Sequence, residues 1–221
     1  MLLTDSIKST TTAIQRRRAA QESKQSAATY AAALSQLSLV SESLKNSMSC
    51  AETMKEKSIV DHPVMSSQTR DDIVDCINNC GKAISDGELT PDMVSILKAK
   101  TDNFSSQILI TWKEASVHYS EGTRGYLSMI GGLTDNPNDA AELSKKIREL
   151  TEGTVSLKSI DSLVESVSKA KKITDSFSLN SDIELFLKKV SSRQATIRDI
   201  TPNILKWLTE KNLLDKLRVN Y

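Results

Sequence analysis

Two cysteines and two histidines are the side chains of this sequence that are best suited to binding a metal. Cys76 and Cys80 lie four residues apart, so a helix would place both sulfur atoms on one face. Together with His62 or His118 they could be drawn as a zinc site, because zinc prefers thiolate and imidazole ligands. A structural zinc site needs four well-spaced ligands, however, and the same helix carries three isoleucines. We therefore interpret the two cysteines as small apolar core residues and predict no metal site.

Two further patterns resemble motifs that bind phosphate or perform catalysis. The segment 166–169 matches Ser-x-x-Lys, but its companion motifs are missing and both residue types are common in this sequence. The segment Gly122-Thr-Arg-Gly125 could clamp a phosphate, yet no strand flanks it, and we interpret it as part of a hinge. No nucleophile, acid and base gather around a glycine-rich turn, so the sequence predicts neither an enzyme nor a cofactor.

Clusters of Lys and Arg could contact the phosphates of a nucleic acid. The sequence has 29 basic and 28 acidic residues, so no large net charge favours such a partner, and a solvated charged face is the simpler interpretation. The triple arginine is the best exception, because it interrupts an apolar pattern and could meet DNA or an acidic groove on a protein. The candidate residues for nucleic-acid contact are Arg16, Arg17, Arg18, Lys145, Lys146, Lys171 and Lys172.

The composition predicts helices. The 221 residues include only 7 glycines and 4 prolines, and 4% are aromatic, which disfavours a turn-rich barrel or sandwich of many strands. The predicted fold class is all-α: an elongated helical bundle with long, coiled-coil-like N-terminal helices and a smaller C-terminal helical module.

The first 57 residues predict one long helix with a coiled-coil-like seam. Residues 5–57 contain no glycine or proline, and a helix of that length would extend about 75 Å. Small or apolar residues recur every seven positions, and a second series follows three residues after the later members. The two series are Ala13, Ala20, Ala27, Leu34, Ser41 and Met48, and Tyr30, Leu37, Leu44 and Ala51. We expect Leu34, Leu37, Leu44 and Met48 to bind a partner protein or a second copy, unless a helix within the chain covers them.

Local signals divide the rest of the chain into shorter helices. Pro63 ends the first helix region, a second helix is expected over 67–85, and Thr90-Pro91 begins a long helix that ends near residue 120. Glycines are concentrated in 121–139, which we interpret as a hinge. Helices are expected from 138 or 139 to 152, from 154 to 177, and from a capping box formed by Ser181 and Glu184. The predicted domains are thus 1–120 and 140–221, joined by the hinge.

The last segment predicts one well-delimited helix followed by a short extended tail. Thr201-Pro202 marks the start of the helix, and Asn212 is a plausible left-handed stop. Its large apolar residues should either cover the preceding helices or bind a partner. For Trp207 the intramolecular core is the simpler interpretation. The candidate docking residues are Trp207, Leu208, Leu213 and Leu214.

The C-terminal segment, with these signals in this order, also resembles the end of a known kind of protein. A Thr-Ile segment at 196–197, the Thr-Pro start at 201–202, Trp207-Leu208 and the closing Leu213-Leu-Asp-Lys-Leu-Arg-Val219 are similar to the ends of uncharacterised bacterial helical accessory proteins. Those proteins belong to multigene, ATPase-containing anti-phage systems. The resemblance covers only residues 196–221 and includes no catalytic motif. It implies a larger partner subunit, such as an ATPase or a nuclease.

Cysteine usage and the absence of long apolar runs predict a cytoplasmic protein. Three cysteines are too few and uneven for a disulfide framework, and no export signal or membrane span is expected. The leading hypothesis is a non-enzymatic helical adaptor or subunit of a complex, which pairs either with a second copy of itself, as a homo-oligomer, or with a larger protein subunit. The alternative is a nucleic-acid-associated accessory subunit that contacts phosphates through basic helix faces. An all-helical enzyme is a third possibility, for which no residue set can be nominated.

Overall fold

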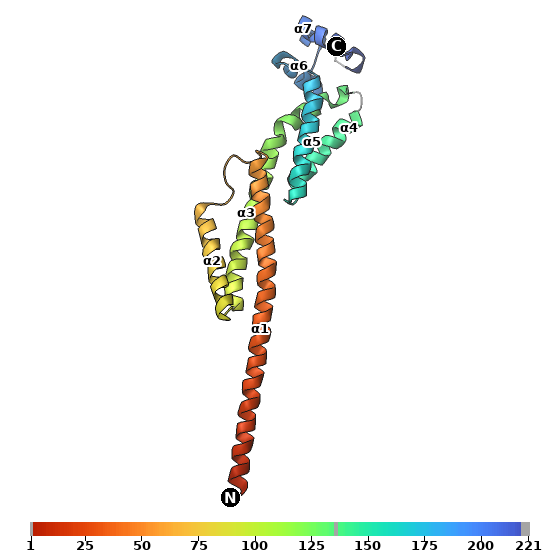
Figure 1. Ribbon diagram of the computed structural model, residues 1–221. Coiled ribbons are helices and arrows are strands. Elements are labelled where there is room, and N and C mark those ends of the chain that lie inside the picture. Colours follow the sequence, from red (N-terminus) through yellow and green to blue (C-terminus); the bar gives the residue numbers. More distant parts are fainter. Residues whose placement is uncertain (1, 135–136, 218–221) are drawn as a thin grey trace. The chain divides into compact units, whose positions relative to one another are not determined.

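The computed structural model confirms the all-α fold class. It describes residues 2–134 and 137–217, and the side chains of these residues apart from 2–14, 20 and 21. Every regular element over the described residues is helical (Figure 1). The elements are α1 (Leu2–Glu56), α2 (Ser67–Asp86), α3 (Pro91–Ile130), η1 (Gly131–Leu133), α4 (Pro137–Glu152), α5 (Leu157–Ser176), α6 (Ser181–Ser191), η2 (Ile197–Asp199), α7 (Pro202–Glu210) and η3 (Leu214–Lys216). Within the part of the chain that the structure describes, no helix is long and apolar enough to cross a membrane.

The chain forms two compact units that differ from the predicted division. Unit 1 comprises Met1–Ser49 and Met65–Gln107, and unit 2 comprises Cys50–Val64 and Ile108–Tyr221. Both α1 and α3 therefore contribute to both units. Heptad spacing and glycine content report local preferences only, so they could not place these boundaries inside two continuous helices.

Unit 1 is a three-helix arrangement of α1, α2 and the first part of α3 (Figure 1). The hydroxyl groups of Ser47 and Ser105 lie 2.8 Å apart and join α1 to α3. The phenol of Tyr30 on α1 donates to the carbonyl of Ile84 on α2 at 3.3 Å. Lys100 of α3 forms an ion pair with Asp72 of α2, with Nζ and Oδ2 3.0 Å apart. These contacts connect each pair of helices in the unit.

The predicted end of the second long helix near residue 120 is wrong, because α3 continues to Ile130. Gly122 and Gly125 lie inside the helix with ordinary negative φ, and a Cβ on either would meet open space. A glycine in a helix costs only about 1 kcal/mol relative to alanine. Leu127 and Ile130 are completely buried, and this apolar burial outweighs that cost. The segment that was expected to be a hinge is thus largely helical.

Unit 2 contains a hydrophobic core around α6 and α7. Its members come from the end of α3, from η1, from the residue after α5, from α6 and α7, and from the segments that follow these two helices. They are Ile130, Leu133, Phe177, Ile183, Phe186, Leu187, Ala195, Ile204, Trp207, Leu208 and Leu213. Helix α4 packs along α5 beside this core. The end of the chain is therefore part of a folded core up to Leu213.

Several predicted helix ends are confirmed, and two starts are shifted by one or two residues. Gly87 ends α2 with φ of 73°, and Asn212 follows α7 with φ of 53°, as their residue types indicate. Helix α5 is capped by Ser156 rather than Thr154, through a capping box with Ser159. Helix α6 is capped by Asn180, so the predicted box of Ser181 and Glu184 is wrong. Capping signals recur every few residues here, and only packing selects among them. The tail predicted to be extended from Leu213 onward is wrong in its first part, because Leu214–Lys216 form the 3-10 helix η3; residues 218–221 lie outside the described residues.

Candidate binding surfaces

From residue 33 onward the seam of α1 is covered within the chain, but in a different register from the predicted one. Of the earlier seam positions, Ala27 is exposed, and the side chains of Ala13 and Ala20 lie outside the described residues. Ala33, Val40 and Leu44 are buried, with exposed fractions of 1%, 6% and 5%. Leu37 is half-buried. Leu34 and Met48 are instead exposed, at 37% and 41%. The series through Leu37 and Leu44 was thus placed correctly, whereas the other buried series runs through Ala33 and Val40, one residue before the predicted one. Alanine and leucine at adjacent positions made the two registers equivalent in the sequence.

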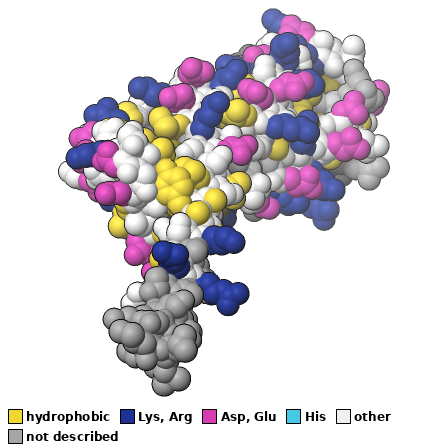
Figure 2. All heavy atoms as spheres, turned by 60° about the horizontal axis from the view of Figure 1, so that its bottom comes forward, with side chains coloured by type: hydrophobic (Ala, Val, Ile, Leu, Met, Phe, Trp, Pro, Cys, Tyr) yellow, Lys and Arg dark blue, Asp and Glu magenta, His cyan; other side chains and the backbone are white. Residues whose placement is uncertain are grey.

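Three exposed apolar side chains and the half-buried Tyr30 form a patch on α1 and α2 of unit 1. We call the apolar patch the four residues Tyr30, Leu34, Ile77 and Ile84. Ile77 and Ile84 are exposed at 43% and 39%, and they were predicted to be core. The bond from Tyr30 to the Ile84 carbonyl brings the two helices together here, and Leu34 lies one turn further along α1. Figure 2 shows hydrophobic side chains gathered beside the described start of α1.

Helix α3 contacts an adjacent flank of α2 through Cys80 and Asp72 and leaves these isoleucines partly exposed. The thiol of Cys80 lies 4.0 Å from the Met93 carbonyl of α3, and Asp72 pairs with Lys100. On a helical wheel, Ile77 and Ile84 lie on the flank of α2 away from Asp72. The Lys100 hydrogen bond, together with a second one from Gln68, lowers the pKa of Asp72 below its usual value. The contact between α2 and α3 therefore includes a charged pair whose carboxylate already has two hydrogen-bond donors. The side of α2 that faces α1 instead presents exposed apolar side chains.

The first part of α1 has no covering helix among the described residues. Every described side chain from Gln15 to Thr29 is exposed, including the three arginines Arg16, Arg17 and Arg18. Residues 22–30 line an open groove of about 430 Å³ with the α2–α3 turn, residues 87–91. Over residues 15–29, four basic residues and one acidic residue give a charge of +3. The stretch before the apolar patch is thus positively charged, chiefly through its three arginines, whereas the groove beside Tyr30 carries the acidic side chains Glu22 and Glu88.

The predicted C-terminal docking residues divide between the core and the surface. Trp207, Leu208 and Leu213 are buried, at 5%, 1% and 2%, as the intramolecular alternative for this segment requires. Leu214 is exposed at 50% and does not belong to the hydrophobic core of unit 2. The side chains of Trp207 and Lys211 also hydrogen-bond the carbonyls of Phe177 and Ser176 at the end of α5. Most of this apolar surface therefore serves the fold of unit 2.

The candidate lysines of α4 and α5 do not form one basic surface. Lys145 lines one groove, whereas Lys146 and Lys172 line another that also contains Asp139 and Glu142. Lys171 is exposed and lines neither of these two grooves. Adjacent residues on a helix point about 100° apart, which explains why a cluster in the sequence divides in space.

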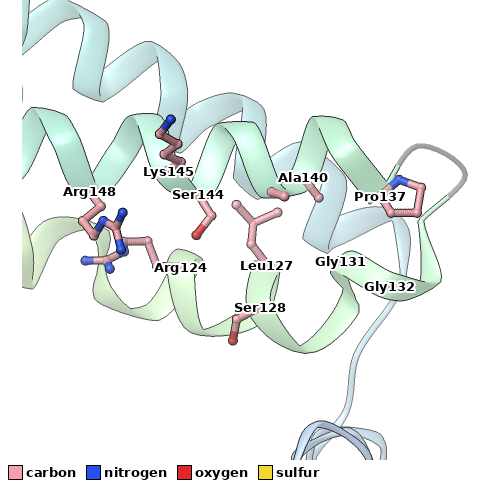
Figure 3. Close-up of a pocket in the computed structure, with 11 residues that line it drawn as sticks. Arg124, Leu127, Ser128, Gly131, Gly132, Pro137, Ala140, Ser144, Lys145 and Arg148 are labelled. Carbon is pink, nitrogen blue, oxygen red and sulfur yellow. The ribbon is translucent and has the colours of Figure 1, made fainter.

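The groove that contains Lys145 also brings together two arginines, Arg124 of α3 and Arg148 of α4. In Figure 3 their guanidinium groups point toward one another at one end of the groove, and Ser144 is directed toward α3 beside them. The groove has a volume of about 510 Å³. The sequence showed Arg124 only as part of a Gly-x-x-Gly segment and did not relate it to Arg148. Only the packing of α4 on the end of α3 brings them together.

Two of the three cysteines, Cys50 and Cys80, are poor nucleophiles in this environment. Burial raises the pKa of the Cys50 and Cys80 thiols, so both stay protonated near neutral pH. Cys76, four residues from Cys80, is half-buried. Among the described residues, no group of three Cys, His, Asp or Glu side chains is arranged to hold a metal ion.

Comparison of the chain with protein-family models, with curated proteins and with solved structures found no match.

Proposed function

We propose that this protein is a non-enzymatic helical adaptor that joins a larger protein subunit through unit 1. The observation that carries the proposal is the apolar patch of Tyr30, Leu34, Ile77 and Ile84 beside an uncovered stretch of α1. Contiguous apolar surface of this kind costs free energy in water and commonly marks a protein interface. It is formed by two helices rather than by one scattered side chain.

The uncovered stretch of α1 supports the same proposal. Helix α1 begins at Leu2, so about 30 Å of helix precede the groove at Glu22. A helix of this length with few apolar residues is marginal in water, and most helical stability in proteins comes from tertiary packing. Contact with a partner would provide that packing.

The chemistry of the two surfaces indicates the kind of partner. An amphipathic helix could lay its apolar face on the apolar patch, and acidic residues at its flank would meet Arg16, Arg17 and Arg18. The resemblance of residues 196–221 to accessory proteins of anti-phage systems suggests that the larger subunit is a cytoplasmic ATPase or nuclease. The uncovered first part of α1, which precedes the packed coiled-coil-like seam, is then the segment that contacts this subunit.

Purification of the tagged full chain from its source cells, followed by quantitative mass spectrometry, tests the proposal. We expect one larger protein in stoichiometric yield, and its loss with L34E or I77E. The matched control is L39E: Leu39 is exposed at 66%, about 140° around the helix from Leu34, and should keep the partner. An unchanged partner yield with both patch variants would contradict the proposal. Sedimentation of the purified chain distinguishes a second copy from a different protein.

A nucleic-acid-associated role is the second candidate, and the exposed arginines Arg16, Arg17 and Arg18 favour it. Phosphate contacts release counterions, so binding to an arbitrary duplex should weaken steeply with salt and with substitution of all three arginines by glutamine. Binding that does not respond to salt would argue against this role.

A further inference from the structure

The structure points to a binding site in unit 2 that the adaptor function does not use. We propose that the groove between the end of α3 and α4 binds the phosphate group of a small soluble molecule through Arg124 and Arg148. A ligand bound there would act on unit 2 and not on the surface of unit 1 that the proposed adaptor function uses.

The groove has the size and the mixed lining of a small-ligand site. Its volume of about 510 Å³ falls within the range of about 300–1,000 Å³ that is usual for such sites. One end carries the two arginines and Ser144 (Figure 3). The other end is lined by Leu127, Ala140 and Pro137, with the glycines of η1. A phosphate would occupy the basic end, and the body of an organic ligand the apolar end.

The arginines lack the partners that such groups normally have. The Nε of Arg124 is buried and makes no hydrogen bond within the described residues. Over the same residues, neither guanidinium has a carboxylate within 4 Å. A buried donor without a partner costs free energy, and two facing cations repel each other. An oxyanion between them would remove both penalties at once.

The geometry of the two side chains favours phosphate. Each guanidinium offers a planar fork of N–H donors, and the tetrahedral oxygens of a phosphate can accept from two forks together. The hydroxyl of Ser144 points toward α3 between Arg124 and Leu127, where it can add a further donor. The proposal requires only these three side chains, Arg124, Arg148 and Ser144, to contact the phosphate.

The surroundings of the groove argue for a small molecule rather than a nucleic acid. Helix α4 carries four acidic and three basic residues, so it offers no continuous basic track for a phosphate backbone. The ammonium of Lys145, at the edge of the groove, lies 3.8 Å from the carboxylate of Glu149. Glu149 thus offsets part of the positive charge of Lys145, and the arginine pair carries most of the unpaired charge of the groove.

Titration calorimetry of the full chain at constant ionic strength, with inorganic phosphate and with phenyl phosphate, tests the proposal. We expect binding to the wild-type chain and a loss of about tenfold or more in affinity for R124Q and for R148Q. The matched control is R198Q, which removes one exposed arginine of unit 2 and should bind as the wild type does. Tighter binding of phenyl phosphate assigns the site to phosphomonoesters, and equal binding assigns it to free phosphate; both support the proposal.

A variant that supplies the missing anion keeps the test independent of folding defects. S144D would place a carboxylate beside the arginines, and S144N is its neutral control. We expect S144D to melt at a higher temperature than S144N in phosphate-free buffer and to lose the phosphate response. No binding of either ligand by the wild type, or equal binding by R124Q and R148Q, would overturn the proposal. Displacement of phosphate by duplex DNA with a steep salt dependence would overturn the assignment to a small molecule.

Discussion

The indole Nε1–H of Trp207 donates a hydrogen bond to the backbone carbonyl of Phe177 at 2.7 Å. Phe177 is the C-cap of α5, where helix carbonyls have no partner within the helix. The ammonium of Lys211 donates to the neighbouring Ser176 carbonyl at the same distance. Two side-chain donors, Trp207 of α7 and Lys211 directly after it, thus provide partners for two carbonyls at the end of α5. The indole of Trp207 also belongs to the hydrophobic core of unit 2.

Replacing Trp207 should destabilise unit 2 in two separable ways. W207F keeps much of the apolar volume but leaves the Phe177 carbonyl buried without its donor, which we expect to cost about 1–3 kcal/mol. W207A also leaves a cavity and should cost about 3–5 kcal/mol. Urea denaturation followed by circular dichroism measures both. L205A is the control, since Leu205 is exposed at 49% on the same helix and should change stability by less than about 0.5 kcal/mol. Equal stability of W207F and wild type would show that the hydrogen bond contributes nothing.

The Asp199 carboxylate should titrate at unusually low pH. The ammonium of Lys189 lies 2.5 Å away and, with the backbone N–H and hydroxyl of Thr196, lowers its pKa from 3.8 to about 2. Because the pKa is lower in the folded state, this carboxylate stabilises the fold above about pH 4, and the contribution is lost as pH falls from about 4 to about 2. Carbon-detected NMR titration of the side chain measures the value.

The variant K189M separates the ion pair from the other contacts of Asp199. Loss of the Lys189 ammonium in K189M should move the Asp199 pKa part of the way back toward 3.8, because the two hydrogen bonds from Thr196 remain. In D199N the acid-dependent loss of stability between pH 4 and pH 2 should be smaller than in the wild type. A wild-type pKa near 3.8 would refute the ion pair in solution.

The observed register of α1 predicts that alanine substitutions of two leucines of the predicted seam, Leu34 and Leu44, change the stability by different amounts. L44A removes a side chain that is 5% exposed and should cost about 2–5 kcal/mol in the stability of the chain. L34A removes one that is 37% exposed and should cost far less, while weakening partner binding. Thermal denaturation of the two variants decides between the registers. Larger destabilisation by L34A would restore the register first expected from the sequence.

The start of α5 gives a test of cap selection by packing. The hydroxyl of Ser156 accepts the Ser159 N–H at 3.1 Å, and the Ser159 hydroxyl accepts the Ser156 N–H at 2.8 Å. S156A should therefore destabilise the chain by about 1 kcal/mol. T154A, at the residue first expected to be the cap, serves as the control and should be nearly neutral. The two midpoints of urea denaturation give the comparison; equal midpoints would mean that Ser156 is not the cap.

Local chemistry made much of the helix plan predictable. The helix-starting pair at Thr90-Pro91 and the one at Thr201-Pro202 both begin helices, and Gly87 and Asn212 both follow helix ends in the left-handed conformation. Each of these signals acts through a few neighbouring residues, so no knowledge of the fold is needed. Scarce glycine, proline and aromatic residues likewise determined the all-α class.

Local sequence signals located most of the helices, whereas packing decided how far α3 extends and which side chains each helix face contacts. Heptad spacing left Ala33 and Leu34 equivalent, and packing buried the first and exposed the second. Glycines at 122 and 125 indicated a break, but the burial of Leu127 kept the helix intact. The meeting of Arg124 and Arg148 had no signature at all, because residues on separate helices become neighbours only through packing across the chain.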